Sequence, residues 1–255
     1  MPRLPRRLAH GEEATLVEHL EELRARLLIM LLAVGVCAAV AYAFHHRIIG
    51  LLVEPLPDEH EQLLTLGPLE PFSTSIKVSI YAGLLAALPI VLWQLWSFLA
   101  PAMEEHSQRV ISLFVAFATA LLACGIAFAY VIVLPAALHF LTNYDSEHYD
   151  ILIRARDYYR FVSFVLLGVA LAFEVPVFVL ALVRLRILSA AQLRRTWRLG
   201  IFVMTVIGVL LPGVDPVSTI LSVIPLVGLY ALSIGLATFF ERRWQRAGVL
   251  WTATE

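Results

Sequence analysis

Residues 19–26 read HLEELRAR and lead directly into the first long apolar segment of the chain. Leucines recur with helical spacing, at positions 16, 20, 23 and 27, which predicts one apolar stripe along a helix. Glu18, Glu22 and Arg26 are spaced by four residues and share the opposite face with His19. We expect an amphipathic helix at the membrane surface that continues into the membrane. Its polar face is either a solvated anchor or a docking surface for a charged partner.

The composition of the whole chain predicts an integral membrane protein. Apolar residues fill 60% of the 255 positions, above the roughly one half that is usual in globular proteins. The net charge of −1 gives no basic footprint for nucleic acid, so no nucleic-acid partner is expected. Cys37 and Cys124 fall inside apolar segments, where cysteine behaves as a small hydrophobe. We therefore expect no disulfide framework, no metal site and no cofactor.

Six charge-poor segments predict an all-α fold with six transmembrane helices. They cover residues 27–44, 78–100, 110–134, 161–183, 199–211 and 217–240. The fifth has only 13 residues, about 20 Å of helix against a hydrocarbon core of roughly 30 Å, so a short helix is expected there. Long outer loops are expected at about 45–77 and 135–160. The predicted division is an amphipathic cytoplasmic segment 1–26, a transmembrane domain 27–240 and a cytoplasmic tail 241–255.

The distribution of basic residues predicts that both termini face the cytoplasm. Fourteen of the 19 Lys and Arg residues fall on the side of the termini. The five on the other side are Arg47, Lys77, Arg154, Arg156 and Arg160. Short cytoplasmic loops carry the excess of positive charge in membrane proteins, so the side of the termini is assigned to the cytoplasm.

Glu174 is the most costly residue to place in a membrane. It lies near the middle of the fourth apolar segment, where a charged side chain costs about 2.5–3.5 kcal/mol on insertion scales. Pro176 follows two residues later and cannot bond back to the carbonyl of Ala172, so the helix should open there. Two interpretations remain open: a protonated acid bonded to a neighbouring helix, or a functional intramembrane acid.

Several short motifs follow one another along the chain: HLEELRAR at 19–26, EPL at 54–56, PF at 71–72 with IK at 76–77, WSFLAP at 96–101, FEVP at 173–176, Asp215 and IPL at 224–226. In this order they resemble the TatC family of twin-arginine translocase subunits. The resemblance covers roughly residues 15–243. Each motif is weak by itself, but their shared order is difficult to reach by chance.

The resemblance implies a cupped bundle and a multi-pass protein of the cell membrane that is no enzyme. It implies a receptor that binds twin-arginine signal peptides at the cytoplasmic face. With TatA- and TatB-type single-span partners, in a hetero-oligomer of several copies, the receptor would export folded proteins. No phosphate-binding loop is present in the sequence, so the proton-motive force is the expected energy source.

The same resemblance implies two sets of site residues. The signal-peptide set is Glu22, Arg24, Arg26, Glu105, Phe98 and Pro101. The partner-binding and intramembrane polar set is Glu174, Asp215, Pro55 and Phe72. Carboxylates are the expected receptors for paired guanidinium groups, because bidentate charge-assisted hydrogen bonds are strong.

The chain departs from the family pattern at Ser107, where the resemblance leads us to expect a second acid. Glu104 and Glu105 lie about one turn earlier and are the candidates to replace it. A second function stays open from the residues: a proton-coupled secondary transporter that uses Glu174. The sequence Glu104 to Arg109 also fits an E-E-x-x-x-R pattern of intramembrane proteases, but residues 21–26 fit it equally well. That pattern is therefore too unspecific to predict an enzyme.

Overall fold

A computed structural model describes residues 16–57, 63–99, 108–145, 148, 151–185, 187–210 and 216–246. The regular elements in these ranges are helices. One isolated β-bridge pairs Leu64 with Arg154. In chain order they are α1 (Leu16–Ala43), α2 (His45–Val53), α3 (Glu70–Leu99), α4 (Gln108–Phe128), the π-helical turn η3 (Ala129–Val133), α5 (Leu134–Asn143), α6 (Ala155–Ala172), α7 (Val175–Arg184), α8 (Ala190–Arg195), α9 (Trp197–Leu210) and α10 (Pro216–Arg246).

The predicted spans are confirmed as helices of the right length and composition. Among the residues that the structure describes, five helical stretches are long and apolar enough to cross a membrane: His19–Ala43, Glu70–Phe98, Ser112–Asn143, Ala155–Arg184 and Thr219–Glu241. The third joins α4, η3 and α5, and the fourth joins α6 and α7. The segment predicted to be short forms α9, with 14 residues. The chain is therefore a multi-pass membrane protein.

The outer connections are shorter than predicted. Within the range 45–77, α2 forms directly after α1 and α3 already begins at Glu70. In the range 135–160, α5 continues to Asn143 and α6 starts at Ala155. The prediction was wrong because hydropathy locates the lipid-facing part of a helix, whereas the backbone stays helical through polar residues beyond it.

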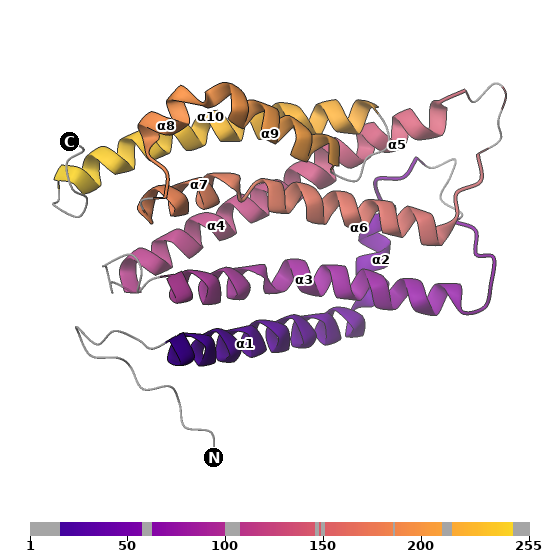
Figure 1. Ribbon diagram of the computed structural model, residues 1–255. Helices are drawn as coiled ribbons and strands as arrows, with labels where there is room; N and C mark the ends of the chain where they lie inside the picture. Colours follow the sequence, from indigo (N-terminus) through magenta and orange to yellow (C-terminus); the bar gives the residue numbers. More distant parts are fainter. Residues whose placement is uncertain are drawn as a thin grey trace, which may run out of the picture.

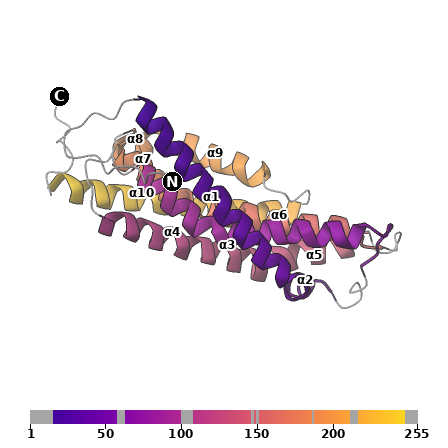
Figure 2. The same ribbon diagram turned by 90° about the horizontal axis from the view of Figure 1, so that it is seen from below.

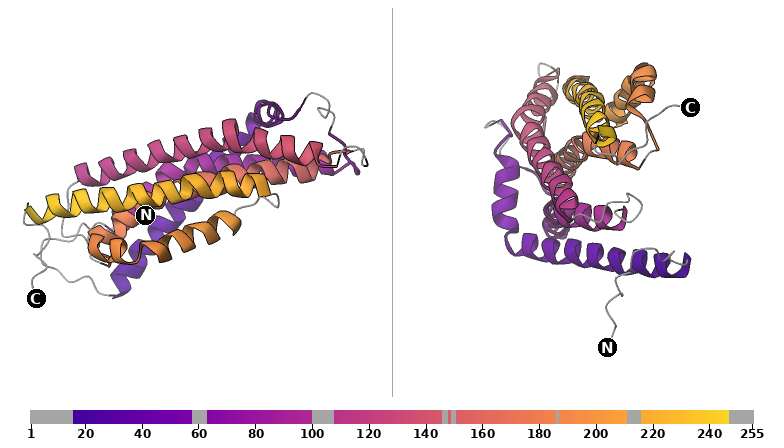
Figure 3. Two further views of the ribbon diagram at one scale, coloured as in Figure 1. Left: turned by 90° about the horizontal axis from the view of Figure 1, so that it is seen from above. Right: turned by 90° about the vertical axis from the view of Figure 1, so that its left-hand side faces the viewer.

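The helices form an open, curved layer rather than a closed ring. In Figure 1 the long helices run side by side, and α1 crosses α3 obliquely in Figure 2. Figure 3 shows α1 on one flank of the layer and α9 on the other. α1 starts and α10 ends at the same end of the layer, at the left of Figure 1, which we call the α8 end. The opposite end, which holds α2, is the α2 end.

The predicted interfacial segment continues without a break into the first span as the single helix α1. Its leucine stripe faces outward, since Leu20, Leu23 and Leu27 are exposed, while Glu22 and Arg26 turn toward α3 and are half-buried. The helix that begins with this motif therefore presents its polar face to the protein and its leucines to the surroundings.

Two tyrosines fix α2 to the layer. Tyr158 of α6 donates a hydrogen bond to the carbonyl oxygen of Leu52 at 2.6 Å. Tyr130 of η3 donates to the carbonyl oxygen of Leu51 at 2.8 Å and contacts the Glu54 carboxylate at 2.9 Å. The last carbonyl groups of a helix have no hydrogen-bond partner inside that helix. The two tyrosine hydroxyls supply such partners for the carbonyls of Leu51 and Leu52 at the end of α2.

Candidate functional site

The predicted site residues do not form one cluster. Glu22, Arg24, Arg26 and Phe98 lie at the α8 end, Pro55 and Phe72 lie at the α2 end, and Glu174 lies between α6 and α7. Pro101, Glu105 and Asp215 lie outside the described residues, as do Glu104 and Ser107.

At the α8 end, Glu22 forms a paired acid on α1. Arg26 donates to its Oε1 atom from Nε at 3.0 Å and from a terminal guanidinium nitrogen at 2.5 Å. The same guanidinium group reaches Gln94 of α3, whose Oε1 lies 3.4 Å from it. Glu22 and Arg26 are 28% and 21% exposed, so the pair is partly shielded from water. Both bonds use one carboxylate oxygen, and in the described part of α1 and α3 the Oε2 atom accepts none.

One turn earlier on α1, His19 stacks on Phe98 of α3. Their ring centroids are 4.5 Å apart and the rings are inclined by 24°. Together with the contact between Arg26 and Gln94, this stack places the polar face of α1 against the last turn of α3. Phe98 therefore supplies an aromatic surface within about two turns of Glu22.

The sequence did not predict a role for Gln94. It is a polar side chain within the charge-poor segment 78–100, and that isolation was the available signal. Arg24, by contrast, is exposed and lies apart from the Glu22 pair, since successive helical residues point in different directions.

In the middle of the layer, Glu174 occupies the break between α6 and α7. The helix stops at Ala172 and resumes at Val175, with Pro176 in its first turn, so the predicted opening is confirmed. The Glu174 side chain is 1% exposed, and both carboxylate oxygens lack a hydrogen-bond partner among the described residues. A buried acid without partners is costly and uncommon in folded proteins. In this conformation the chain's own helices therefore enclose the Glu174 carboxylate.

At the α2 end, the two remaining predicted residues are accessible to different degrees. Pro55 is half-buried after α2, and Phe72 is exposed in the first turn of α3.

Among the residues that the structure describes, no group of three His, Cys, Asp or Glu side chains could hold a metal ion.

The chain was compared with known protein families and proteins. The family model described as Sec-independent protein translocase protein (TatC) matches residues 18–225. TatCd of Bacillus subtilis is 32% identical over 235 residues, which cover 92% of this chain and 96% of that protein. A TatC protein of Helicobacter pylori is 32% identical and covers 86% of this chain and 87% of its own length. The chloroplastic protein of Pisum sativum is 33% identical over 88% of this chain.

The chain spans slightly less than two thirds of the chloroplastic relatives' length, 64% for the Pisum sativum protein. Two solved structures also match, both described as the twin arginine translocase receptor TatC. The first has a TM-score of 0.75 at 31% identity and covers 87% of this chain and 98% of that chain. The second, in the detergent DDM, has a TM-score of 0.77 at 32% identity, with 86% and 99% covered.

Proposed function

Since the chain belongs to the TatC family of Sec-independent protein translocase proteins, we propose that it is the receptor subunit of a twin-arginine translocase. In this role it binds twin-arginine signal peptides at the α8 end. It assembles with TatA- and TatB-type single-span proteins to export folded proteins, driven by the proton-motive force. The matched proteins are described as a translocase and a receptor, and the proposed role involves no catalysis.

The geometry of Glu22 carries this proposal. Arg26 holds the carboxylate by Oε1, which leaves Oε2 as an acceptor for an incoming guanidinium group. A carboxylate fixed in this way loses little conformational freedom when it binds, and partial burial strengthens a charge-assisted hydrogen bond. Phe98, stacked on His19, gives the apolar part of a signal peptide a neighbouring surface.

Crosslinking of a twin-arginine signal peptide to the purified full chain tests the proposal. Glu22→Gln keeps the shape and removes the charge, so crosslinking should be lost while the protein stays folded. Loss of one partner of a desolvated charge pair costs about 2–5 kcal/mol, which is more than tenfold in affinity.

Glu21→Gln is the matched control, because Glu21 is the exposed neighbour on the same helix. A peptide with both arginines replaced by lysine should bind weakly to the unaltered chain, since lysine cannot form the bidentate bond. Normal crosslinking by Glu22→Gln would refute the receptor role of this residue.

We infer a second role for Glu174, as the polar contact for a partner's transmembrane helix. The basis is its two unpartnered carboxylate oxygens in an apolar environment. Because the side chain is buried within this chain, the contact requires the break between α6 and α7 to open. A proton-coupled transporter that uses Glu174 has no support from the family match or from the relatives, which are described as translocase proteins.

A further inference from the structure

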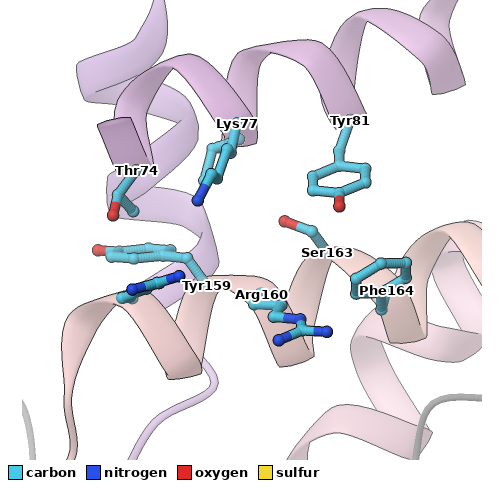
Figure 4. A pocket seen from close by; sticks show the side chains of 9 residues that line it. Thr74, Lys77, Tyr81, Tyr159, Arg160, Ser163 and Phe164 are labelled. Carbon is cyan, nitrogen blue, oxygen red and sulfur yellow. The ribbon is translucent and has the colours of Figure 1, made fainter. Parts of the chain in front are cut away.

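A cavity of about 250 Å³ lies between α3 and α6 near the α2 end. Figure 4 shows Lys77 and Tyr81 extending from α3 toward Tyr159 and Ser163 on α6. It lies near the opposite end of the layer from the Glu22 and Arg26 pair and is not part of the site described above. Thr74 and Phe164 also line the cavity.

The described lining of the cavity contains cations and no acidic side chain. Lys77, Arg156 and Arg160 contribute three positive charges, and none of its nine described lining residues is acidic. Arg154, the neighbouring basic residue, is neutralised by Glu70 and takes no part. The lining therefore carries a formal charge of about +3, which repels a cation and attracts an anion.

Hydroxyl groups add directional hydrogen bonding to this charge. Thr74, Tyr81, Tyr159 and Ser163 all line the cavity, and each can donate a hydrogen bond to an oxygen atom. Thr74, Tyr159 and Ser163 are themselves buried, so their hydroxyls are held in place by packing. Cations combined with fixed hydroxyl donors suit the several oxygens of a phosphate group.

The cavity lies where a phospholipid headgroup would be. Lys77 immediately precedes the charge-poor segment 78–100, and Arg160 immediately precedes the segment 161–183. Both cations therefore sit at the border between the polar helix ends and the apolar part of the span, which is the headgroup level of a bilayer. Ile80, about one turn along α3 from Lys77, is 48% exposed and offers apolar surface to an acyl chain.

Packing alone explains the cavity less well. Lysine and arginine near helix ends commonly extend to the membrane interface, and that behaviour needs neither a shared cavity nor buried hydroxyls. The volume is below the roughly 300–1,000 Å³ of pockets that enclose whole drug-sized ligands, so it suits a headgroup whose chains remain outside.

We propose that the cavity between α3 and α6 binds the headgroup phosphate of an anionic phospholipid. Lys77 and Arg160 supply the principal charges, Arg156 closes the solvent side, and the hydroxyls of Thr74 and Ser163 fix the phosphate oxygens. The lipid fastens α3 to α6 at the end of the layer where the two helices begin.

Native mass spectrometry of the full chain in detergent tests the proposal with two lipids and one soluble anion. Phosphatidylglycerol should bind several-fold more tightly than phosphatidylcholine, whose headgroup carries no net charge. The double variant Lys77→Gln/Arg160→Gln should lower the phosphatidylglycerol affinity by tenfold or more, because each lost charge-assisted bond corresponds to about a tenfold change. Lys77→Arg should retain binding, which shows that the charge and not the lysine itself is needed.

Arg47→Gln is the matched control, since Arg47 is a basic residue of α2 outside the cavity. If the double variant misfolds, Ser163→Ala is the second test: it removes a lining hydroxyl without changing the charge and should weaken phosphatidylglycerol binding mildly. Equal binding of both lipids would overturn the proposal, as would an equal loss in the Arg47→Gln control. Displacement of phosphatidylglycerol by millimolar inorganic phosphate would assign the cavity to a soluble anion and likewise overturn the lipid assignment.

Discussion

Glu70 and Arg154, 84 positions apart in the sequence, are joined by two hydrogen bonds that connect the start of α3 to the start of α6. Arg154 donates from Nε to Oε1 at 2.7 Å and from a terminal nitrogen to Oε2 at 3.1 Å. These hydrogen bonds, which Arg154 donates to the Glu70 carboxylate, raise the pKa of the Arg154 guanidinium. The Leu66 amide also donates to Glu70, at 2.9 Å. Backbone bonds of Leu64 to Ile153 and Ala155 close the connection between α2 and α3 onto α6.

This ion pair should stabilise the α2 end. Glu70→Gln and Arg154→Gln should each lower the midpoint of thermal unfolding in detergent by several degrees. Each substitution leaves the charge of the remaining residue without its ion-pair partner. The double variant should lose less than the sum of the two, since the residues interact directly. Arg47→Gln should leave the midpoint unchanged. Additive losses in the double variant would show that the pair contributes no coupling.

Gly83 should be required for the position of α1. A Cβ atom at Gly83 would overlap the backbone of Ala38, so α1 rests directly on α3 at this point. Gly83→Val should displace α1 and separate Arg26 from Gln94 and His19 from Phe98. Signal-peptide crosslinking should then fall although Glu22 is intact. Gly35→Val is the control, because a Cβ at Gly35 meets nothing within 4 Å. Equal crosslinking by both variants would contradict this account of helix contact.

Both termini are predicted to face the cytoplasm because of the arginine bias, and cysteine labelling of intact cells checks this. In a chain with Cys37 and Cys124 replaced by serine, a cysteine at Tyr144 should react with a membrane-impermeant maleimide added outside. Tyr144 is 67% exposed at the α2 end. A cysteine at Ala191, exposed on α8, should react only after the membrane is permeabilised. The reverse pattern would invert the topology.

Glu104 or Glu105 is predicted to supply the second acid that is expected at the position of Ser107, and Glu105 is tested first. Glu105→Gln should weaken signal-peptide binding, and Ser107→Glu in the same chain should restore part of the loss, because a carboxylate returns within about one turn. Peptide affinity measured for the three chains provides the comparison. If Glu105→Gln is silent and Ser107→Glu has no effect, Glu22 binds the arginines without this help.

Glu174 is predicted to lower the stability of the isolated chain and to strengthen the binding of single-span partners. Glu174→Leu removes a buried carboxyl group without hydrogen-bond partners, so it should stabilise the isolated chain by about 1–3 kcal/mol. The same variant should lose copurification with single-span partners, whereas Glu174→Gln should retain part of it through its amide. Thermal unfolding and affinity copurification measure the two effects. Unchanged copurification of the leucine variant would leave Glu174 as an internal feature of the fold.

Local sequence determined where the long apolar helices lie. Apolar runs of about 20 residues favour helices across a bilayer, because unpaired backbone groups cannot be left in hydrocarbon. The short α9 and the break before Pro176 follow in the same way from the length of one segment and from one missing amide. The ordered motifs also predicted the family. Each of these properties is set by neighbours in sequence, so no distant contact was needed.

Tertiary structure decided which side chains meet. Spacing placed Glu22 and Arg26 on one face, but only the oblique packing of α1 on α3 brought Arg26 to Gln94 and His19 to Phe98. The pairing of Glu70 with Arg154 and the shared cavity of Lys77 and Arg160 join residues more than 80 positions apart. A charged side chain can pair with many different partners at similar energetic cost, so its neighbours in the sequence do not determine its partner. The partner is determined by how the helices cross, and close contacts such as that of Gly83 with Ala38 fix the crossing.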